Sequence, residues 1–179
     1  MIRGYSDIGF VLAKRNFGEA DRIISVFSKI HGRISLLAKG VRKPSSRKRG
    51  HIDTFNLIKF QASSTKGIDL INEAEVIKDY SHLKNDLQKV AVAYFVNEAV
   101  GKTTQEKERN IHIFNLLGTV FDELSTSDNL KTIRNSFTKE LLSLLGYWPV
   151  GKSLPKPDEK LQEIIERQIY SLRIGKKIQ

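Results

Sequence analysis

The spacing of apolar residues along the chain changes near residue 80. Before this point apolar and polar residues tend to alternate, which is typical of a β-strand with one buried face. In residues 33–39, for example, Ile34, Leu36 and Ala38 fall on one face and polar residues fall on the other. Turn-forming residues separate the alternating runs. The pattern predicts five strands, at residues 6–15, 21–30, 33–39, 54–62 and 67–78.

After residue 80 the apolar residues recur every three or four positions, which is the spacing of an amphipathic helix. The first helix is predicted to bury Leu83, Leu87 and Tyr94. Two further helices are predicted over about residues 111–124 and 130–145. The second half of the chain is therefore predicted to be helical throughout.

The later helices carry end signals of their own. Ser127 or Asp128 is suited to cap the helix that begins near residue 130, and Gly146 lies where that helix is predicted to end. A last amphipathic helix is predicted at about 158–174. Its apolar positions are Leu161, Ile164, Ile165, Ile169 and Leu172. Two of the four prolines lie in the linker before it, so this helix is expected to pack loosely.

Five short strands followed by helices predict an α+β protein with two domains. Residues 1–80 are predicted to form a small barrel and residues 81–179 a helical domain. The strand count and the long connection between the third and fourth strands favour an OB-fold, which binds nucleic-acid strands across one barrel face. Periodicity alone leaves an SH3-like barrel as the alternative.

Composition narrows the class of protein further. The chain has no cysteine, which excludes a disulfide framework and a thiolate zinc site within it. Its longest apolar run, residues 90–96, is much shorter than the roughly 20 residues that span a bilayer. No targeting segment is evident at the N-terminus. These features predict a cytoplasmic protein that does not act at a membrane.

The net charge of +10 is distributed unevenly. Residues 1–50 hold twelve Lys or Arg and three Asp or Glu, so almost the whole excess lies there. A concentrated positive field attracts a polyanion. The source of much of this charge is residues 39–50, here called the basic loop, which hold six cations and no acidic residue. Pro44 interrupts the loop, and Gly40 and Gly50 bracket it.

Long cationic side chains on an irregular loop can follow a phosphate backbone. Other cations in the predicted barrel are expected to lie near the loop, and Phe17 is the aromatic residue best placed to stack on a base. Phe10, Phe27, Phe55 and Phe60 are weaker candidates, because strand phenylalanines are usually buried. The predicted DNA-binding residues are Lys14, Arg15, Phe17, Arg22, Lys29, Arg33, Lys39, Arg42, Lys43, Arg47, Lys48 and Arg49.

The sequence also allows other roles for the loop and for the acidic residues. The loop also has the composition of a solvated connection or of a nuclear-localisation run, whereas it lacks the apolar anchor of a membrane patch. Asp69, Glu73 and Glu75 are predicted to share one strand face, opposite Leu70, Ala74 and Val76. No lysine stands at the spacing of a nuclease signature, and the four histidines are scattered. No catalytic residue, metal site or cofactor is predicted.

Several segments together resemble the RecO family of recombination mediators. The N-terminal segments are residues 15–22 (Arg-Asn-Phe-Gly-Glu-Ala-Asp-Arg), 32–34, 38–43 and 70–75, with Phe55 between the last two. In the helical half, residues 85–100 and 137–149 resemble the family's first long helix and the end of its helical core. Many relatives place a four-cysteine zinc site after the position of Pro149, and this chain has no cysteine there.

The resemblance implies binding of single- and double-stranded DNA, annealing of complementary strands, and cooperation with RecR. It also implies binding of the acidic tail of a single-strand-binding protein (SSB) and, indirectly, loading of RecA. Lys131, Arg134 and Lys139 are the residues predicted to contact that tail. Without the resemblance, an OB-type RNA- or ribosome-binding module remains the alternative, because it would carry the same basic loop.

Overall fold

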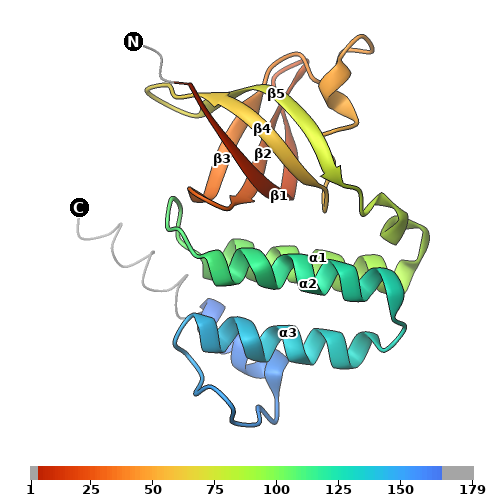
Figure 1. The fold of residues 1–179 in the computed structure, drawn as a ribbon, viewed down its shortest axis with the longest axis vertical. Coiled ribbons are helices and arrows are strands. Elements are labelled where there is room, and N and C mark those ends of the chain that lie inside the picture. The colour runs from red at the N-terminus through yellow and green to blue at the C-terminus, as the bar shows by residue number, and fades with distance from the viewer. Residues whose placement is uncertain (1–3, 167–179) are drawn as a thin grey trace.

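The computed structural model describes residues 4–166, apart from the side chain of Arg47. Five strands come first, then helices (Figure 1). The strands are β1 (Gly4–Phe17), β2 (Asp21–Ser28), β3 (Gly32–Ala38), β4 (Leu57–Ser63) and β5 (Asp69–Lys78). The main helices are α1 (Leu87–Thr103), α2 (Ile111–Thr126) and α3 (Leu130–Leu144). Two short 3-10 helices span Arg47–Arg49 and Ser81–Asn85, and residues 157–166 are helical.

The strands close into a barrel in the order β1-β2-β3-β5-β4. All neighbours are antiparallel except β3 and β5, which pair in parallel at Leu36↔Asp69 and Leu37↔Leu70. This is the topology of an OB-fold, and it confirms the predicted barrel followed by helices. The helices lie beneath one end of the barrel, with α1 and α2 nearest to it (Figure 1).

Alternating side chains fill the barrel as predicted for most strands. Ile34, Leu36 and Ala38 of β3 are all buried. The prediction for β5 was wrong in part, because a register shift opposite Gln61 and Ala62 moves Ile71, not Leu70, to the inside. One extra residue in a strand turns the side chains beyond it to the opposite face of the sheet.

The same shift separates the carboxylates that were predicted to share a face. Glu73 and Glu75 pair with exposed Gln61 and Lys59 and point outward. Asp69 instead lies opposite Leu36, and its carboxylate accepts a hydrogen bond from the Tyr5 hydroxyl at 2.9 Å. The three side chains therefore do not form one cluster.

A second core joins the barrel to the helices. Phe10, Leu12 and Phe27 of the barrel pack in one buried cluster with Phe121 and Leu117 of α2. Leu12 lies on the same face of β1 as Phe10, two positions before it. The β1–β2 register then shifts between Val11 and Ala13, which is a β-bulge. The barrel and the helices share this core. The division of the chain into two domains at residue 80 therefore stays a proposal.

The buried side chain of Asn97 in α1 binds the bulge. Its amide nitrogen donates to the carbonyl oxygens of Leu12 at 2.8 Å and Val11 at 3.3 Å. The Val11 carbonyl also accepts from the Phe55 backbone N–H at 2.9 Å. Asn97 thus supplies a donor to backbone groups that the irregular strand exposes.

Two helix predictions need correction. Tyr94 and Leu87 of α1 are 53% and 84% exposed, whereas Ala93, Val96 and Val100 are buried. Residues 90–100 are apolar around most of the helix, so their spacing did not define one face. The cap of α3 is Asn129, whose side chain accepts from the Thr132 backbone N–H, and not Ser127 or Asp128.

The end of the helical core is partly as predicted. Gly146 follows α3 with a φ of +79°, the left-handed conformation of a helix end. The last helix packs closely where it is described, because Leu161 and Ile164 are both 3% exposed, so the expectation of loose packing was wrong there. Ile169 and Leu172 lie outside the described residues.

We predict that Asn97→Ala lowers the free energy of unfolding by about 1–3 kcal/mol, because the Leu12 carbonyl loses a buried hydrogen-bond donor. Urea denaturation measures the change. Asn115→Ala, at an exposed position of α2, is the matched control and should leave stability nearly unchanged. Equal stability of the two variants would contradict the role given to Asn97.

Candidate nucleic-acid interface

The basic loop is joined to the turn between β1 and β2 at the end of the barrel that faces away from the helices (Figure 1). The backbone N–H of Gly40 donates to the Asp21 carboxylate at 2.7 Å, and that of Arg42 donates to the Ala20 carbonyl at 2.9 Å. These bonds bring several predicted residues to one end of the barrel. We call them the basic tip: Arg15, Phe17, Arg22, Lys39, Arg42 and Lys43.

The cations of the basic tip differ in what they contact. The Arg42 guanidinium donates to the carbonyl oxygens of Glu19 at 3.0 Å and Gly18 at 3.3 Å, so Arg42 also helps to hold the turn. Arg22 donates to the Asn16 side chain at 3.3 Å. Arg15, Lys39 and Lys43 are exposed and have no partner within residues 4–166. Their charges are therefore available to a ligand.

Four other predicted cations lie elsewhere. Lys29 follows β2 at the end opposite Arg22, about 23 Å away for seven residue steps of an extended strand. Lys48 folds back onto β5, where it donates to the Ile71 carbonyl at 3.2 Å. Arg33 donates to the Thr104 carbonyl at 3.0 Å and pairs with Glu106. Lys14 pairs with Asp53.

The two arginines of residues 47–49 are less informative. Arg49 is exposed and has no partner in the described part of the chain. The side chain of Arg47 lies outside the described residues. Both remain predicted contacts.

Burial distinguishes Phe17 from the other four phenylalanines considered for base stacking. Phe10, Phe27, Phe55 and Phe60 are at most 1% exposed, so none of them can stack on a base. Phe17 is 47% exposed at the end of β1, opposite Asp21. It keeps the role predicted for it.

Asp53 connects the barrel to the helical half of the chain. Its carboxylate bonds to Lys14 of β1 and to Lys84, which precedes α1. Burial raises the pKa of Asp53, but the hydrogen bonds and charges of Lys14 and Lys84 outweigh it and hold that pKa at about 2, below the ordinary 3.8. The carboxylate is therefore ionised at neutral pH and holds two lysines together.

We predict that Asp53→Asn lowers the free energy of unfolding at pH 7 by about 1–2 kcal/mol, a figure reduced to allow for partial exposure of the ion pairs. Because the folded pKa is depressed, the contribution of Asp53 is fully present above pH 3.8 and is lost as the pH falls toward 2. Urea denaturation across this range should show the difference from the native chain shrinking. Asp128→Asn, which alters an exposed carboxylate, is the control; a difference that stays constant with pH would contradict the assignment.

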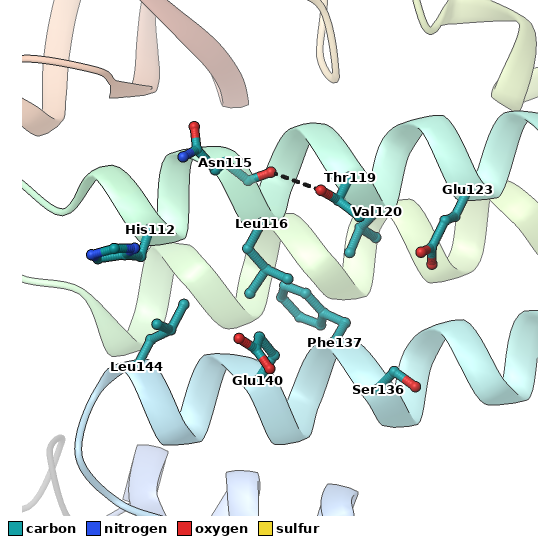
Figure 2. Close-up of a pocket in the computed structure, with 10 residues that line it drawn as sticks. All are labelled: His112, Asn115, Leu116, Thr119, Val120, Glu123, Ser136, Phe137, Glu140 and Leu144. Carbon is teal, nitrogen blue, oxygen red and sulfur yellow. Dashed lines mark hydrogen bonds between the residues drawn. The ribbon is translucent and has the colours of Figure 1, made fainter. Parts of the chain in front are cut away.

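The three residues predicted to bind an acidic tail do not form an obvious site. The Arg134 guanidinium pairs with Asp158 at 3.0 Å and stacks on the Phe95 ring at 3.8 Å, so it joins α1, α3 and the last helix. A groove of about 380 Å³ between α2 and α3 is lined by Glu123 and Glu140 and by no lysine or arginine (Figure 2). Its charge does not favour an acidic peptide. Contact of Lys131 and Lys139 with such a tail stays a prediction.

The sequence-based prediction missed a second groove, which lies between the barrel and α1. Tyr94, Glu98 and Lys102 line it together with Lys14 and Arg33. The three-four spacing of apolar residues instead predicts that Tyr94 lies on the buried face of its helix. The spacing of Tyr94, Glu98 and Lys102 is the sequence signal that could have indicated this groove, because it places them on one face of a helix.

The described residues hold neither a metal-ligand cluster nor a membrane-spanning helix. No group of three or more His, Asp or Glu side chains among residues 4–166 is arranged to hold a metal ion. In the same part of the chain, no helix combines the length and the apolar character needed to cross a bilayer.

The architecture is that of an OB-fold protein: a closed five-stranded barrel, with cations gathered at one end, is joined to a helical bundle. Residues 1–80 match the family model described as "Recombination protein O N terminal", and residues 84–153 match "Recombination protein O C terminal". The chain belongs to the RecO family of DNA repair proteins.

Curated relatives are each named "DNA repair protein RecO". The relative from Pelotomaculum thermopropionicum is 34% identical over 146 residues, which cover 82% of this chain and 57% of the relative. That from Dehalococcoides mccartyi strain 195 is 30% identical over 151 residues, 84% of this chain and 60% of the relative. That from Bacillus subtilis is 27% identical over 141 residues, 79% and 55% respectively. The chain thus spans little more than half the length of these relatives.

Proposed function

We propose that the protein binds single- and double-stranded DNA through the basic tip, without sequence specificity, and anneals complementary strands. The observation that carries the proposal is a set of cations at one end of an OB barrel that have no partner in the described part of the chain: Arg15, Lys39 and Lys43. Contacts of this kind hold phosphates and carry no sequence code. The proposed mechanism is therefore electrostatic.

Annealing follows from the same physics. Two complementary strands repel each other through their phosphates, and a cationic surface lowers that repulsion without having to identify bases. No bond is made or broken, so we propose that the protein is not an enzyme. As a family member it is also proposed to act with RecR and the tail of SSB in loading RecA, within the cytoplasm.

We predict that the double variant Arg15→Ala, Lys43→Ala binds every DNA sequence more weakly. The slope of log affinity against log salt concentration should fall by about two, because each phosphate contact contributes roughly 0.9 for duplex and somewhat less for single strands. Arg42 is left intact because it also holds the turn. Fluorescence anisotropy at several salt concentrations measures the slope.

The matched control is Lys131→Ala, Lys139→Ala, which removes the same charge from α3. Its slope should equal that of the native chain. If both double variants lower the slope equally, the effect is one of net charge and the basic tip is not the contact surface.

Annealing of complementary oligonucleotides tests the wider proposal, and it should weaken in the tip variant at every salt concentration. Competition between single-stranded DNA and structured RNA tests the alternative of an RNA- or ribosome-binding module. A clear preference for RNA would overturn the repair function. Labelled DNA incubated with magnesium should stay intact, and its cleavage would overturn the proposal that the protein is not an enzyme.

A further inference from the structure

The groove between the barrel and α1 has the size of a site for a nucleobase. Its volume is about 420 Å³, and one wall is the outer face of β1 and β2 at Ala13 and Ser25. A cavity of about 150 Å³ holds a benzene-sized ring. The groove therefore has room for a base and part of its sugar.

The other wall is one face of α1. Its residues are spaced by three or four positions and so lie side by side along the helix. They are Tyr94, Asn97, Glu98, Gly101 and Lys102. Gly101 has no side chain, and the opposite wall carries the small residues Ala13 and Ser25, so the groove is open between the two walls.

Tyr94 is held in place on one side and exposed on the other. Its ring packs edge-on against Phe55, with 4.9 Å between ring centroids and 67° between the ring planes, yet the residue is 53% exposed. Phe55 is fully buried with a φ of +81°, a conformation that costs energy for a residue other than glycine and persists only where the surroundings fix it. An exposed aromatic ring on a rigid support is what base stacking requires.

The wall also holds a polar atom that the protein leaves unsatisfied. The carboxamide oxygen of Asn97 is buried and accepts no hydrogen bond from any group in residues 4–166. Such groups are rare in folded proteins, and each calls for a physical explanation. The N–H groups of a base are donors of the kind that this oxygen lacks.

The groove continues from the basic tip along one face of β1. Ala13, Arg15 and Phe17 pair with Ser25, Ile23 and Asp21, and alternate positions of a strand share a face. Phe17 and Ala13 are about 13 Å apart at the rise of an extended strand. A nucleic-acid strand held at the tip therefore reaches the groove within a few nucleotides, in keeping with the 4–16 nucleotides that OB-folds occupy.

The charge of the groove is compatible with a strand. Lys14, Arg33 and Lys102 line it, against the single carboxylate of Glu98. These cations have carboxylate partners of their own within the protein. The pairs of Arg33 and Lys102 are partly exposed and contribute little to stability, so these two cations can exchange their carboxylate for a phosphate. Stacking on Tyr94, and not charge, is thus the main contribution expected here.

We infer that this groove binds an unpaired base stacked on Tyr94, and that it makes the protein bind single strands more tightly than duplex. The inference rests on the proposed function, because the basic tip delivers the strand. The basic tip can hold the phosphates of single-stranded or of duplex DNA. A base inside a duplex, however, is already stacked on its neighbours and cannot enter the groove.

The first test measures Tyr94→Ala against a 20-nucleotide single strand and against the duplex that it forms with its complement. Affinity for the single strand should fall between about 5- and 150-fold, the range for loss of one stacked base. Affinity for the duplex and the salt slope should not change, because stacking releases no counterions. Tyr94→Phe should keep single-strand affinity, and Tyr147→Ala, an exposed tyrosine after α3, is the matched control.

The second test places a fluorescent ring in the groove. Trp148 is the only tryptophan of the chain, so Tyr94→Trp combined with Trp148→Phe gives one reporter. Its emission should be quenched by the single strand and not by an abasic oligonucleotide of the same length and charge. Equal quenching by both, or equal loss of single-strand and duplex affinity in Tyr94→Ala, would overturn the inference.

The two proposals fail in different ways. If the basic tip does not bind DNA, neither the single strand nor the duplex will bind with a salt slope that depends on Arg15 and Lys43. If only the groove is wrongly assigned, both will bind with that slope, and Tyr94→Ala will match the native chain on single strands. Urea denaturation of Tyr94→Ala separates either result from a loss of folding.

Discussion

A β-bulge between Val11 and Ala13 lies where one strand, β1, contacts two hydrophobic cores. Val11 faces the barrel interior, whereas Phe10 and Leu12 on either side of it face the core shared with α2. Such an irregularity exposes backbone carbonyls, and Asn97 of α1 supplies the donor that they need. The barrel and the helices are therefore joined by packing and by hydrogen bonds at the same point of one strand.

This junction also fixes the two candidate binding surfaces relative to each other. Beyond the bulge, β1 carries Ala13 into the wall of the groove and Arg15 and Phe17 to the basic tip. The support for Tyr94 comes from Phe55, whose backbone bonds to Val11 immediately before the bulge. We expect a substitution at the bulge to alter both binding surfaces. A substitution in the basic tip should leave the junction unchanged.

Local patterns in the sequence predicted the fold well, because alternation and helical spacing depend on which face of each element is buried. They failed where one residue changes that face. The extra residue in β5 exchanges Ile71 for Leu70, and the apolar residues around α1 give no single buried side, which is why Tyr94 was misplaced. Periodicity carries no information on such local irregularities.

The sequence also predicted part of the candidate binding site, again where local sequence determines local structure. Clustering of cations in residues 39–50 located the basic loop, because neighbours in sequence stay neighbours in space. Which cations are already paired depends on distant residues: Lys14 meets Asp53, and Arg33 meets Glu106 after α1. No count of charges along the chain reveals those partners.

The outward direction of Glu73 and Glu75 on β5 has a consequence for how the molecule meets a large anion. In the ring of five strands β5 neighbours neither β1 nor β2, so these carboxylates project from a different flank of the barrel than Arg15 of β1. The flank with the carboxylates repels a polyanion while the other attracts it, so the protein has a dipolar field as well as a net charge. Such a field rotates the protein during diffusional approach and makes productive collisions more frequent than chance orientation allows.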